Sequence, residues 1–479
     1  MSGVFANLVA GAWIASSNAV PDINPSDTSD IVGRYAAGDA STVDAAVAAA
    51  RAAFAGWASA SPQARFDVLD RAGDEILRRR EELGELLARE EGKTRAEGIG
   101  EAVRAGYIFK FFAGEALRAG GETLASVRPN ISVELLREPI GVVGLITPWN
   151  FPLAIPAWKI APALAYGNCV VFKPAELVPA CAWAIADILV RAGVPAGVFN
   201  LVMGPGRVVG RAIVATAGID AISFTGSTAT GRGILSEASA RGARVQLEMG
   251  GKNPLVVLDD ADLTVAVDCA VQGAFFSTGQ RCTASSRLIV TSGIHDAFVE
   301  AMVAKLATLR VGHALAADTQ IGPVVDAGQL AQNESYLDLG HAEGAQLAFG
   351  GERIERETVG YFQQPALWVN TRADMRVMRE EIFGPIAGVL KVADYDEALA
   401  AANDTEFGLC SGIVTRSLHA AYDFKRRSQA GMIMVNLPTA GVDYHVPFGG
   451  RKSSSYGPKE QGTYACEFYT TLKTAYIAP

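Results

Sequence analysis

In Pro139-Ile-Gly-Val-Val-Gly-Leu-Ile146 a short, apolar, β-branched run ends in the rigid turn Thr147-Pro-Trp-Asn-Phe-Pro152. This pattern predicts a buried strand closed by a turn. It returns three times, in Cys169–Phe172 before Lys173-Pro-Ala-Glu176, in Phe199–Met203 before Gly204-Pro-Gly206, and in Ala221–Phe224 before Thr225-Gly-Ser227. Four such strand–turn–helix units imply a parallel sheet with crossover helices. Ligands bind these sheets at the carboxyl ends of the strands, where all four turns lie.

The flanking sequence predicts further helices and a second α/β unit. Apolar residues at helical spacing predict helices over 41–57, 62–91 and 94–118. Composition changes after Gly251, and strand-like pieces follow at Arg287–Val290, Ile386–Val392 and Met432–Val435. The last segment, Phe468–Ile477, alternates large and small residues without an evident partner in its own part of the chain. Pairing elsewhere, such as across a subunit interface, is therefore expected.

Length and composition narrow the class of protein. A chain of 479 residues, 49% hydrophobic and 19% charged with 50 glycines, is typical of an α/β enzyme with two or more domains. The net charge of −9 and the lack of a basic tract argue against a nucleic-acid partner. No apolar run reaches the ~18 residues needed to span a bilayer, so no membrane association is expected. Met1–Trp13 has no signal-peptide pattern. A cytoplasmic location is expected.

Cysteine spacing points to one unusual thiol. The six cysteines form no CxxC pair, so neither a disulfide framework nor a zinc site is predicted and no metal is expected. Five have mainly apolar or small neighbours, as buried structural thiols do. Cys282 instead follows a Gly/Ser/Thr turn, Ser277-Thr-Gly-Gln-Arg-Cys282.

Cys282 and Glu248 have the pattern of a covalent catalytic pair. A thiolate attacks a carbonyl, and a carboxylate can activate the water that releases the acyl group. Glu248 lies in Val245-Gln-Leu-Glu-Met-Gly-Gly251, where apolar flanks predict desolvation and a raised pKa. Asn150, fixed between two prolines, is suited to donate to an oxyanion. The plainer alternatives are a structural thiol, a solvated carboxylate and a turn asparagine.

Two glycine-rich turns could hold a phosphate. Thr225–Gly231 and Gly204–Gly210 each lie after a strand, although neither is a clean GxGxxG motif. Lys173 and Glu176 could hold a ribose, but a lone Lys/Glu pair is more often surface decoration.

Together these motifs resemble the NAD(P)-dependent aldehyde dehydrogenase superfamily over essentially the whole chain. The residues that carry the resemblance are Pro148–Pro152, Lys173–Glu176, Phe224–Ser227, Leu247–Gly251, Gly279–Cys282, Glu381–Pro385 and Pro447–Gly450, with Met249 where leucine is usual. The resemblance implies an α/β fold with a Rossmann-type cofactor domain (1–118 and 140–248), an α/β catalytic domain (249–449) and a β oligomerisation arm (119–139 and 450–479). It also implies a homodimer or homotetramer.

By this resemblance Cys282 is the nucleophile, Glu248 the general base and Asn150 the oxyanion donor, and Lys159 is a lysine near the active-site carboxylate. Lys173 and Glu176 would hold the adenosine ribose. The other implied cofactor residues are Gly226 and Ser227 at the pyrophosphate, Gly206 and Gly210 near the adenine, Glu381 at the nicotinamide ribose, Phe383 beside the nicotinamide, and Ile146, Trp149, Phe224 and Met249. Glu176 would repel a 2′-phosphate, so NAD is expected over NADP, which Lys173 could tolerate.

The substrate is implied by two stretches, Trp158–Asn168 and Gly273–Ser286. They look most like bacterial α-ketoglutarate semialdehyde (2,5-dioxopentanoate) dehydrogenases of sugar-acid catabolism. Succinate semialdehyde dehydrogenases usually carry arginine where Trp158 stands, so an acidic substrate needs another cation. Arg104 and Arg281 are candidates, whereas Trp158, Tyr107 and Phe276 would equally suit an aromatic aldehyde. Betaine aldehyde and succinate semialdehyde stay as alternatives.

Two other classes of protein share this fold. A non-catalytic structural descendant would be expected to lose the nucleophile, which this chain keeps. A CoA-dependent acylating dehydrogenase would lack the base glutamate, so Glu248 favours hydrolysis of the thioester.

Overall fold

Four parallel strands form the centre of the first sheet, as the repeated strand–turn pattern predicts. The computed structural model describes residues 3–16 and 18–479. The central order is β10-β7-β8-β9, with Val142–Ile146 of β7 in register against Cys169–Lys173 of β8. The complete eight-stranded sheet comprises β19 (Ser455–Tyr456), β11 (Arg244–Glu248), β10 (Ala221–Thr225), β7 (Val142–Ile146), β8 (Cys169–Lys173), β9 (Phe199–Leu201), β1 (Asn7–Val9) and β2 (Ala12–Ile14).

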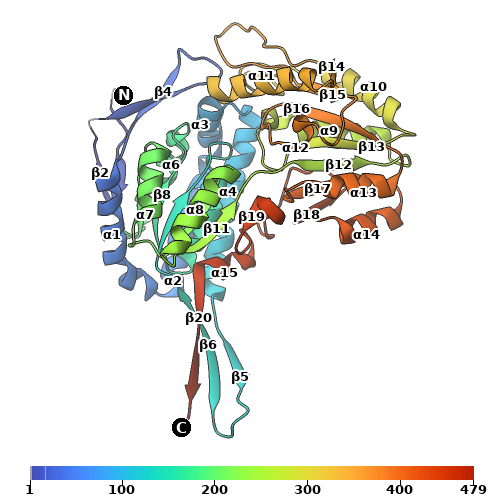
Figure 1. Cartoon of the computed structure of the whole chain (residues 1–479). Coiled ribbons are helices and arrows are strands. Elements are labelled where there is room, and N and C mark those ends of the chain that lie inside the picture. The colour runs from blue at the N-terminus through green and yellow to red at the C-terminus, as the bar shows by residue number, and fades with distance from the viewer. Residues whose placement is uncertain (1–2, 17) are drawn as a thin grey trace.

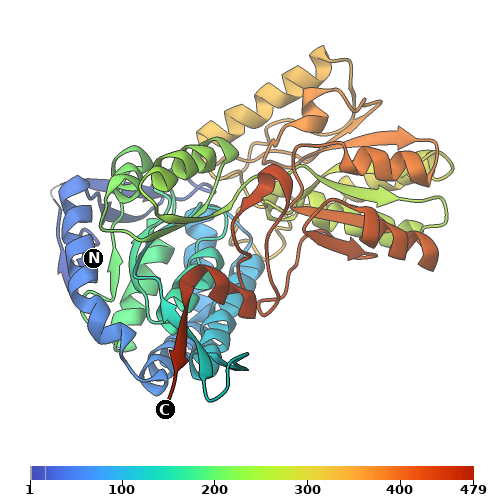
Figure 2. The same ribbon diagram turned by 60° about the horizontal axis from the view of Figure 1, so that its bottom comes forward.

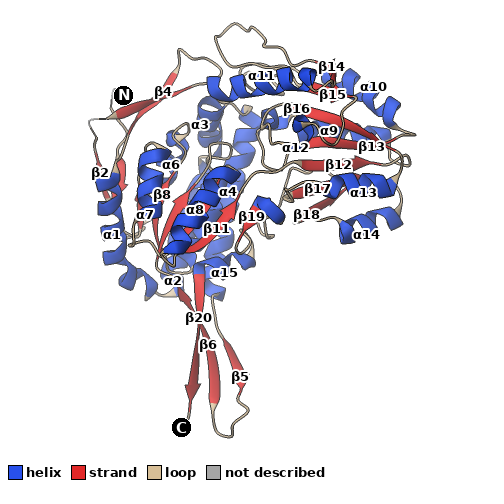
Figure 3. Cartoon of the chain, viewed as in Figure 1, coloured by secondary structure: helices blue, strands red, loops and turns tan. Residues whose placement is uncertain are grey.

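Helices cover the two large sheets of the molecule, as Figure 3 shows. Around the first sheet they are α1 (Ala40–Ala58), α2 (Pro62–Arg78), α3 (Arg80–Glu91), α4 (Arg95–Arg118), α5 (Ala154–Ala165), α6 (Pro179–Arg191), α7 (Arg211–Ala215) and α8 (Thr228–Ala240). The expectation of one helix over 62–91 is wrong, because the chain turns at Arg79. The turn lets α2 bury Leu69 and Ile76 while α3 buries Leu83 and Leu87.

A second α/β unit follows Gly251, as expected, and lies beside the first in both Figure 1 and Figure 2. Its seven strands run in the order β14 (Gln346–Phe349), β15 (Ala366–Val369), β16 (Ile386–Val392), β13 (Ser285–Thr291), β12 (Asn253–Val257), β17 (Cys410–Val414) and β18 (Met432–Val435). Its helices are α9 (Leu263–Ala274), α10 (His295–Leu306), α11 (Ala327–Ala342), α12 (Arg376–Arg379), α13 (Tyr395–Asn403) and α14 (Leu418–Arg427). The edge strand β14 is antiparallel to β15.

A narrow three-stranded arm projects from the body and carries the C-terminus at its end (Figure 1). It consists of β5 (Glu122–Ala125), β6 (Ser132–Pro139) and β20 (Thr470–Ile477). The terminal strand does have a partner in its own chain, because β20 pairs antiparallel with β6 from Thr470↔Pro139 to Ile477↔Ser132. The sequence conceals this partner because the two strands lie more than 300 residues apart.

Residues 450–469 lie outside the arm sheet and return to the first sheet. Ser455 and Tyr456 of β19 pair with Glu248 and Leu247 of β11, and the short helix α15 (Cys466–Tyr469) follows. A small hairpin of β3 (Ala19–Ile23) and β4 (Ile31–Ala36) completes the fold. Within the described residues, no helix combines the length and apolar character that crossing a membrane requires.

Candidate active site

Cys282 is presented by a strained turn between α9 and β13. Ser277 and Thr278 have left-handed backbone conformations, with φ of 49° and 57°. Residues other than glycine rarely adopt this conformation. The Glu97 carboxylate holds this turn by accepting from the backbone N–H of Ser277 at 2.8 Å and from its hydroxyl at 2.9 Å. The Thr278 hydroxyl donates to the Gly322 carbonyl at 3.1 Å. Tertiary contacts therefore fix the position of the thiol.

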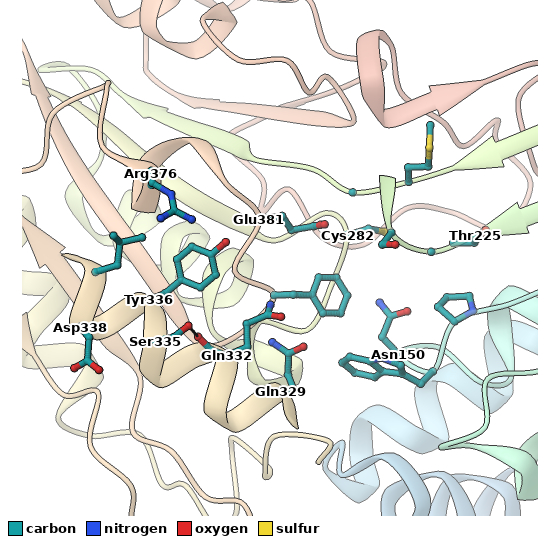
Figure 4. Close-up of a pocket in the computed structure, with 18 of the residues that line it drawn as sticks. Asn150, Thr225, Cys282, Gln329, Gln332, Ser335, Tyr336, Asp338, Arg376 and Glu381 are labelled. Atoms are coloured by element: carbon teal, nitrogen blue, oxygen red, sulfur yellow. Dashed lines mark hydrogen bonds between the residues drawn. The ribbon is translucent and has the colours of Figure 1, made fainter. Parts of the chain in front are cut away.

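The half-buried Cys282 side chain lines two cavities. One has a volume of about 900 Å³ and also contains Asn150 and Glu381 (Figure 4). The other, of about 260 Å³, contains Arg104 and Trp158. Burial raises the pKa of the Cys282 thiol above its ordinary range, and the negative charges of Glu381 and Glu248 raise it further. A thiol between two cavities can meet a reactant from either side.

Asn150 follows β7 and points toward Cys282 in Figure 4. Its side-chain nitrogen donates one hydrogen to the Gln280 carbonyl at 3.0 Å, which leaves the second hydrogen for an oxyanion. Buried Lys93 donates to the Asn150 carbonyl and pairs with Glu101 at 3.1 Å. Glu101 in turn accepts from the backbone N–H groups of Leu153 and Ala154. These contacts orient the carboxamide before any substrate arrives.

Glu248 lies at the end of β11 and is only 2% exposed. Burial raises the pKa of its carboxyl to about 8, as its apolar flanks predict, and the negative charge of Glu460 adds to the rise. Ser455 donates to one carboxylate oxygen at 2.6 Å and, together with Lys459, opposes that shift. A Cβ at Gly449 would lie 2.6 Å from the other oxygen, so glycine is required there. A carboxyl with this pKa can accept a proton near neutral pH.

Lys159 is fully buried behind this carboxylate. Its ammonium group donates to the Ser223 hydroxyl at 2.7 Å and pairs with Glu460. Lys159 therefore acts on Glu248 electrostatically, with Glu460 as its direct partner. The first sheet and the segment after β19 jointly build this buried charge cluster.

Twelve residues expected to hold a cofactor lie around two adjoining cavities. A cavity of about 640 Å³ is lined by Ile146, Trp149, Lys173, Glu176, Gly206, Gly210, Phe224, Gly226 and Ser227. Met249, Glu381 and Phe383 line the 900 Å³ cavity, and Trp149, Gly226 and Ser227 line both. Most of these residues lie at the carboxyl ends of the parallel strands β7 to β11, whereas Glu381 and Phe383 come from the second unit, between α12 and β16.

The chemistry of this surface fits a dinucleotide. The N-terminus of α8, capped by Ser227, opens on it and offers backbone N–H groups to a pyrophosphate. The hydroxyls of Thr147 and Thr225 line the 640 Å³ cavity and are buried without a hydrogen-bond partner. Burial lowers the pKa of Lys173 to about 8, and the exposed Glu176 opposes this shift. Polar groups that lack partners indicate a ligand that supplies them.

Glu381 reaches the Cys282 region because Gly250 leaves room for its carboxylate. Its carboxylate accepts from the Gly251 backbone N–H at 2.9 Å, and burial raises its pKa to about 7. A Cβ at Gly250 would overlap this carboxylate. Phe383 packs edge-on against Trp149, with ring centroids 5.3 Å apart. The Gly-Gly pair and the Glu-Ile-Phe-Gly motif, far apart in the sequence, therefore meet beside Cys282.

The 260 Å³ cavity brings together only part of the expected substrate set. Arg104, Trp158 and Arg281 line it. The structure places Tyr107 elsewhere: it is 45% exposed and stacks on Tyr444 at 5.6 Å. Phe276 packs instead against the core of the second unit. Tyr107 and Phe276 therefore do not form the wall of this cavity.

Sequence reasoning missed several residues that build the site. Some lie on α4 or in the loop before it, others on α11, and others in or after β19; they are Lys93, Glu97, Glu101, Gln329, Gln332, Tyr336, Ser455, Lys459 and Glu460. Thr94-x-x-Glu97 is a readable capping box, but the second contact of Glu97, with Ser277, is not local.

Known proteins resemble this chain along its whole length. The model of the aldehyde dehydrogenase family matches residues 13–475. The chain is 43% identical to the alpha-ketoglutaric semialdehyde dehydrogenase of Bacillus subtilis, over 99% of this chain and 98% of that protein. It is 41% identical to the 2,5-dioxopentanoate dehydrogenase of Saccharolobus solfataricus, over 98% of each. The crystal structure of Staphylococcus aureus betaine aldehyde dehydrogenase in complex with NAD+ is 33% identical, with a TM-score of 0.96 over 99% of this chain and 95% of that one.

Proposed function

The chain belongs to the aldehyde dehydrogenase family, and from that premise we propose that it uses NAD+ to oxidise α-ketoglutarate semialdehyde to 2-oxoglutarate. The observation that carries the chemistry is the placement of Cys282 between two cavities, with Asn150 fixed toward it. The relatives named for this semialdehyde support the substrate. We propose that the unit built on the first sheet is the cofactor domain and that the unit built on the second sheet is the catalytic domain.

The reaction begins when the Cys282 thiol releases its proton to solvent and the thiolate sulfur adds to the aldehyde carbon. The Asn150 side chain and the backbone N–H of Cys282 donate to the resulting oxyanion. When bound, NAD+ supplies the acceptor for the hydride that leaves this carbon. The acyl group then remains on Cys282 as a thioester. Glu248 takes a proton from water, the water oxygen attacks the thioester carbon, and the carboxylic acid leaves as the sulfur is released.

NAD is the proposed cofactor, held in the 640 Å³ cavity with its reactive end in the 900 Å³ cavity. Lys173 and Glu176 would hold the adenosine ribose, and Glu381 the nicotinamide ribose. The NAD+ complex of the betaine aldehyde dehydrogenase supports this choice. The Glu176 carboxylate accepts from ribose hydroxyls but repels a 2′-phosphate, so kcat/KM for NAD+ should exceed that for NADP+. A ratio in favour of NADP+ would reverse this assignment.

The 260 Å³ cavity favours an anionic aldehyde over a cationic one. Trimethylammonium groups prefer aromatic surroundings without competing cations. Here the Arg104 guanidinium lies 5.6 Å from the centre of the Trp158 ring and would repel betaine aldehyde. One observation favours an aromatic aldehyde as the second candidate: Trp158 stacks on Phe448 with centroids 5.4 Å apart, which gives the cavity a flat apolar wall.

A substrate panel tests the proposal. We expect kcat/KM for 2,5-dioxopentanoate to exceed that for benzaldehyde, betaine aldehyde and succinate semialdehyde by at least about tenfold. With CoA present, the product should remain 2-oxoglutarate, because Glu248 directs water to the thioester. The Cys282→Ala variant should form no NADH with any of these aldehydes. A higher kcat/KM for benzaldehyde would transfer the assignment to aromatic substrates, and normal turnover by the variant would refute the covalent mechanism.

The arm is proposed to join subunits into a homodimer or homotetramer in the cytoplasm. Its strand β20 lies at an edge of the sheet, and Leu472, Tyr476 and Ile477 are exposed on it. Exposed apolar side chains along an edge strand are typical of a surface that pairs with another chain.

A further inference from the structure

The 260 Å³ cavity beside Cys282 contains three cationic side chains, Lys93, Arg104 and Arg281. Two of them are already paired. Lys93 lies 3.1 Å from the Glu101 carboxylate and 3.6 Å from that of Glu91. Arg281 lies 3.1 Å from Glu97, and the same nitrogen donates to the Ser277 hydroxyl at 2.8 Å. Their charges are therefore balanced within the protein.

Arg104 is the cation of this set whose charge is not paired by a carboxylate within the described residues. One of its terminal nitrogens donates to the neutral side chain of Gln461 at 3.2 Å. Its Nε is buried and has no hydrogen-bond partner. Burial lowers the pKa of the guanidinium, and the charges of Glu101, Asp443 and Cys282 oppose that shift. Arginine nevertheless stays protonated in proteins, so the cavity wall carries a full positive charge.

Two neighbouring donors also lack acceptors. The Trp158 indole Nε1 belongs to a residue of the same cavity wall and is buried without a partner. The side-chain nitrogen of Gln461, whose oxygen accepts from Arg104, is also buried without a partner. Buried N–H groups are normally satisfied, so the unpaired Nε of Arg104 and these two neighbouring donors together indicate a ligand rich in acceptors. A carboxylate offers about four lone-pair sites in a plane and matches the guanidinium fork.

We propose that Arg104 binds the carboxylate of the substrate, with the Trp158 indole N–H as a second donor. This inference rests on the proposed function and names the residue that selects an acidic aldehyde at that same site. The aldehyde carbon lies at Cys282, the carboxylate lies at Arg104, and the methylene groups between them contact Phe151 and Phe448, which line the same cavity. Arg281 is excluded because its charge is neutralised by Glu97.

A pair of substrates isolates this contact. 4-Oxopentanal has the chain of 2,5-dioxopentanoate with a methyl group in place of the carboxylate. Arg104→Met should lower kcat/KM for 2,5-dioxopentanoate on the order of 100-fold, as removal of a charged hydrogen bond does. It should change kcat/KM for 4-oxopentanal by less than about threefold, because that aldehyde makes no contact with the charge. Arg104→Lys keeps the positive charge but loses the forked guanidinium group. Its kcat/KM for 2,5-dioxopentanoate should be about tenfold higher than that of Arg104→Met.

Arg281→Met is the matched control in the same cavity. Arg281 supports Glu97 and the turn that presents Cys282. Its loss should therefore lower kcat/KM for both aldehydes by the same factor. NADH formation in the first turnover and the unfolding temperature of each variant show whether the protein is intact.

The outcomes separate this inference from the proposed function. If wild-type enzyme prefers 2,5-dioxopentanoate to 4-oxopentanal but Arg104→Met lowers both equally or neither, Arg104 is not the anchor and the proposed function stands. If wild-type enzyme shows no such preference, the acidic substrate itself is wrong and the anchor falls with it. A selective loss in Arg104→Met with partial rescue in Arg104→Lys supports both.

Discussion

Glu248→Gln should separate formation of the thioester from its hydrolysis. The rise in the Glu248 pKa from its ordinary 4.5 to about 8 corresponds to about 5 kcal/mol against the charged form. About a tenth of the carboxyl is therefore ionised at pH 7 and about nine tenths at pH 9. Only the ionised form can take a proton from water. Steady-state turnover of the wild-type enzyme should rise about tenfold over this range, provided that hydrolysis limits the rate.

Stopped-flow measurement of NADH is the decisive assay. In Glu248→Gln the first turnover should still release about one NADH per active site, because attack by Cys282 and hydride loss need no water. The following steady-state rate should fall by roughly 10²–10⁴, the range supplied by a general base, and lose its dependence on pH. If Glu248→Gln formed no NADH in the first turnover, Glu248 would also be needed before hydrolysis, and the assignment of its role to hydrolysis alone would be refuted. An unchanged steady state would refute its role as a base altogether.

Glu460→Gln is the matched control, because it removes a charge but keeps an acceptor for Lys159. The negative charge of Glu460 raises the Glu248 pKa, so the pH profile of turnover in Glu460→Gln should move to lower pH.

The pH dependence of stability gives a second test of the raised Glu248 pKa. Between pH 4.5 and about 8 the folded state retains a proton that the unfolded state has lost, so the free energy of unfolding falls as pH rises. Glu248→Gln has no carboxyl at this position and should not show this fall. The Tm of the variant minus that of wild type should therefore increase from pH 4.5 to about 8.

Two further predictions concern the groups around Cys282. Asn150→Ala should lower kcat by about 10²–10³, because the oxyanion loses a donor fixed by Gln280, and a loss confined to KM would contradict this role. Gly250→Ala should weaken NAD+ binding, since the new methyl group displaces the Glu381 carboxylate. Fluorescence titration with NAD+ measures this effect, and unchanged affinity would show that Glu381 does not contact the cofactor.

Local patterns in the sequence predict the central sheet well. Each of the strands β7, β8, β9 and β10 ends in a Pro-rich or Gly-rich turn, and the order of such units along the chain fixes a parallel arrangement. Asn150 lies in the turn after β7, as the strand–turn pattern predicts, and Glu248, identified from its apolar flanks, lies at the end of β11 in the same sheet. Cys282 differs from the other thiols by its polar turn alone.

Contacts between distant segments account for what the sequence conceals. Ser455 reaches Glu248 through the β19–β11 pair, about two hundred residues away in the chain. Both α2 and α3 pack against α4, and helical periodicity carries no sign of the break between them at Arg79. Exposed Tyr107 and inward Arg104 lie three residues apart on one helix. Only the partners of Arg281 and Arg104 distinguish a structural arginine from one available to a ligand.

Burial sets the chemistry of the two cavities in opposite ways. On the cofactor side it raises the pKa values of Glu248 and Glu381, and their negative charges raise that of the Cys282 thiol. The thiol therefore rests protonated while the site is empty. On the other side, Arg104 places an unbalanced positive charge near the same sulfur. An acidic substrate neutralises that charge on arrival, so Arg104 does not assist ionisation of Cys282 once this substrate is bound. A neutral aldehyde leaves the Arg104 charge in place beside Cys282. The enzyme therefore selects against a neutral aldehyde because that aldehyde lacks a carboxylate to bind Arg104, and not because the Cys282 thiol is less ionised.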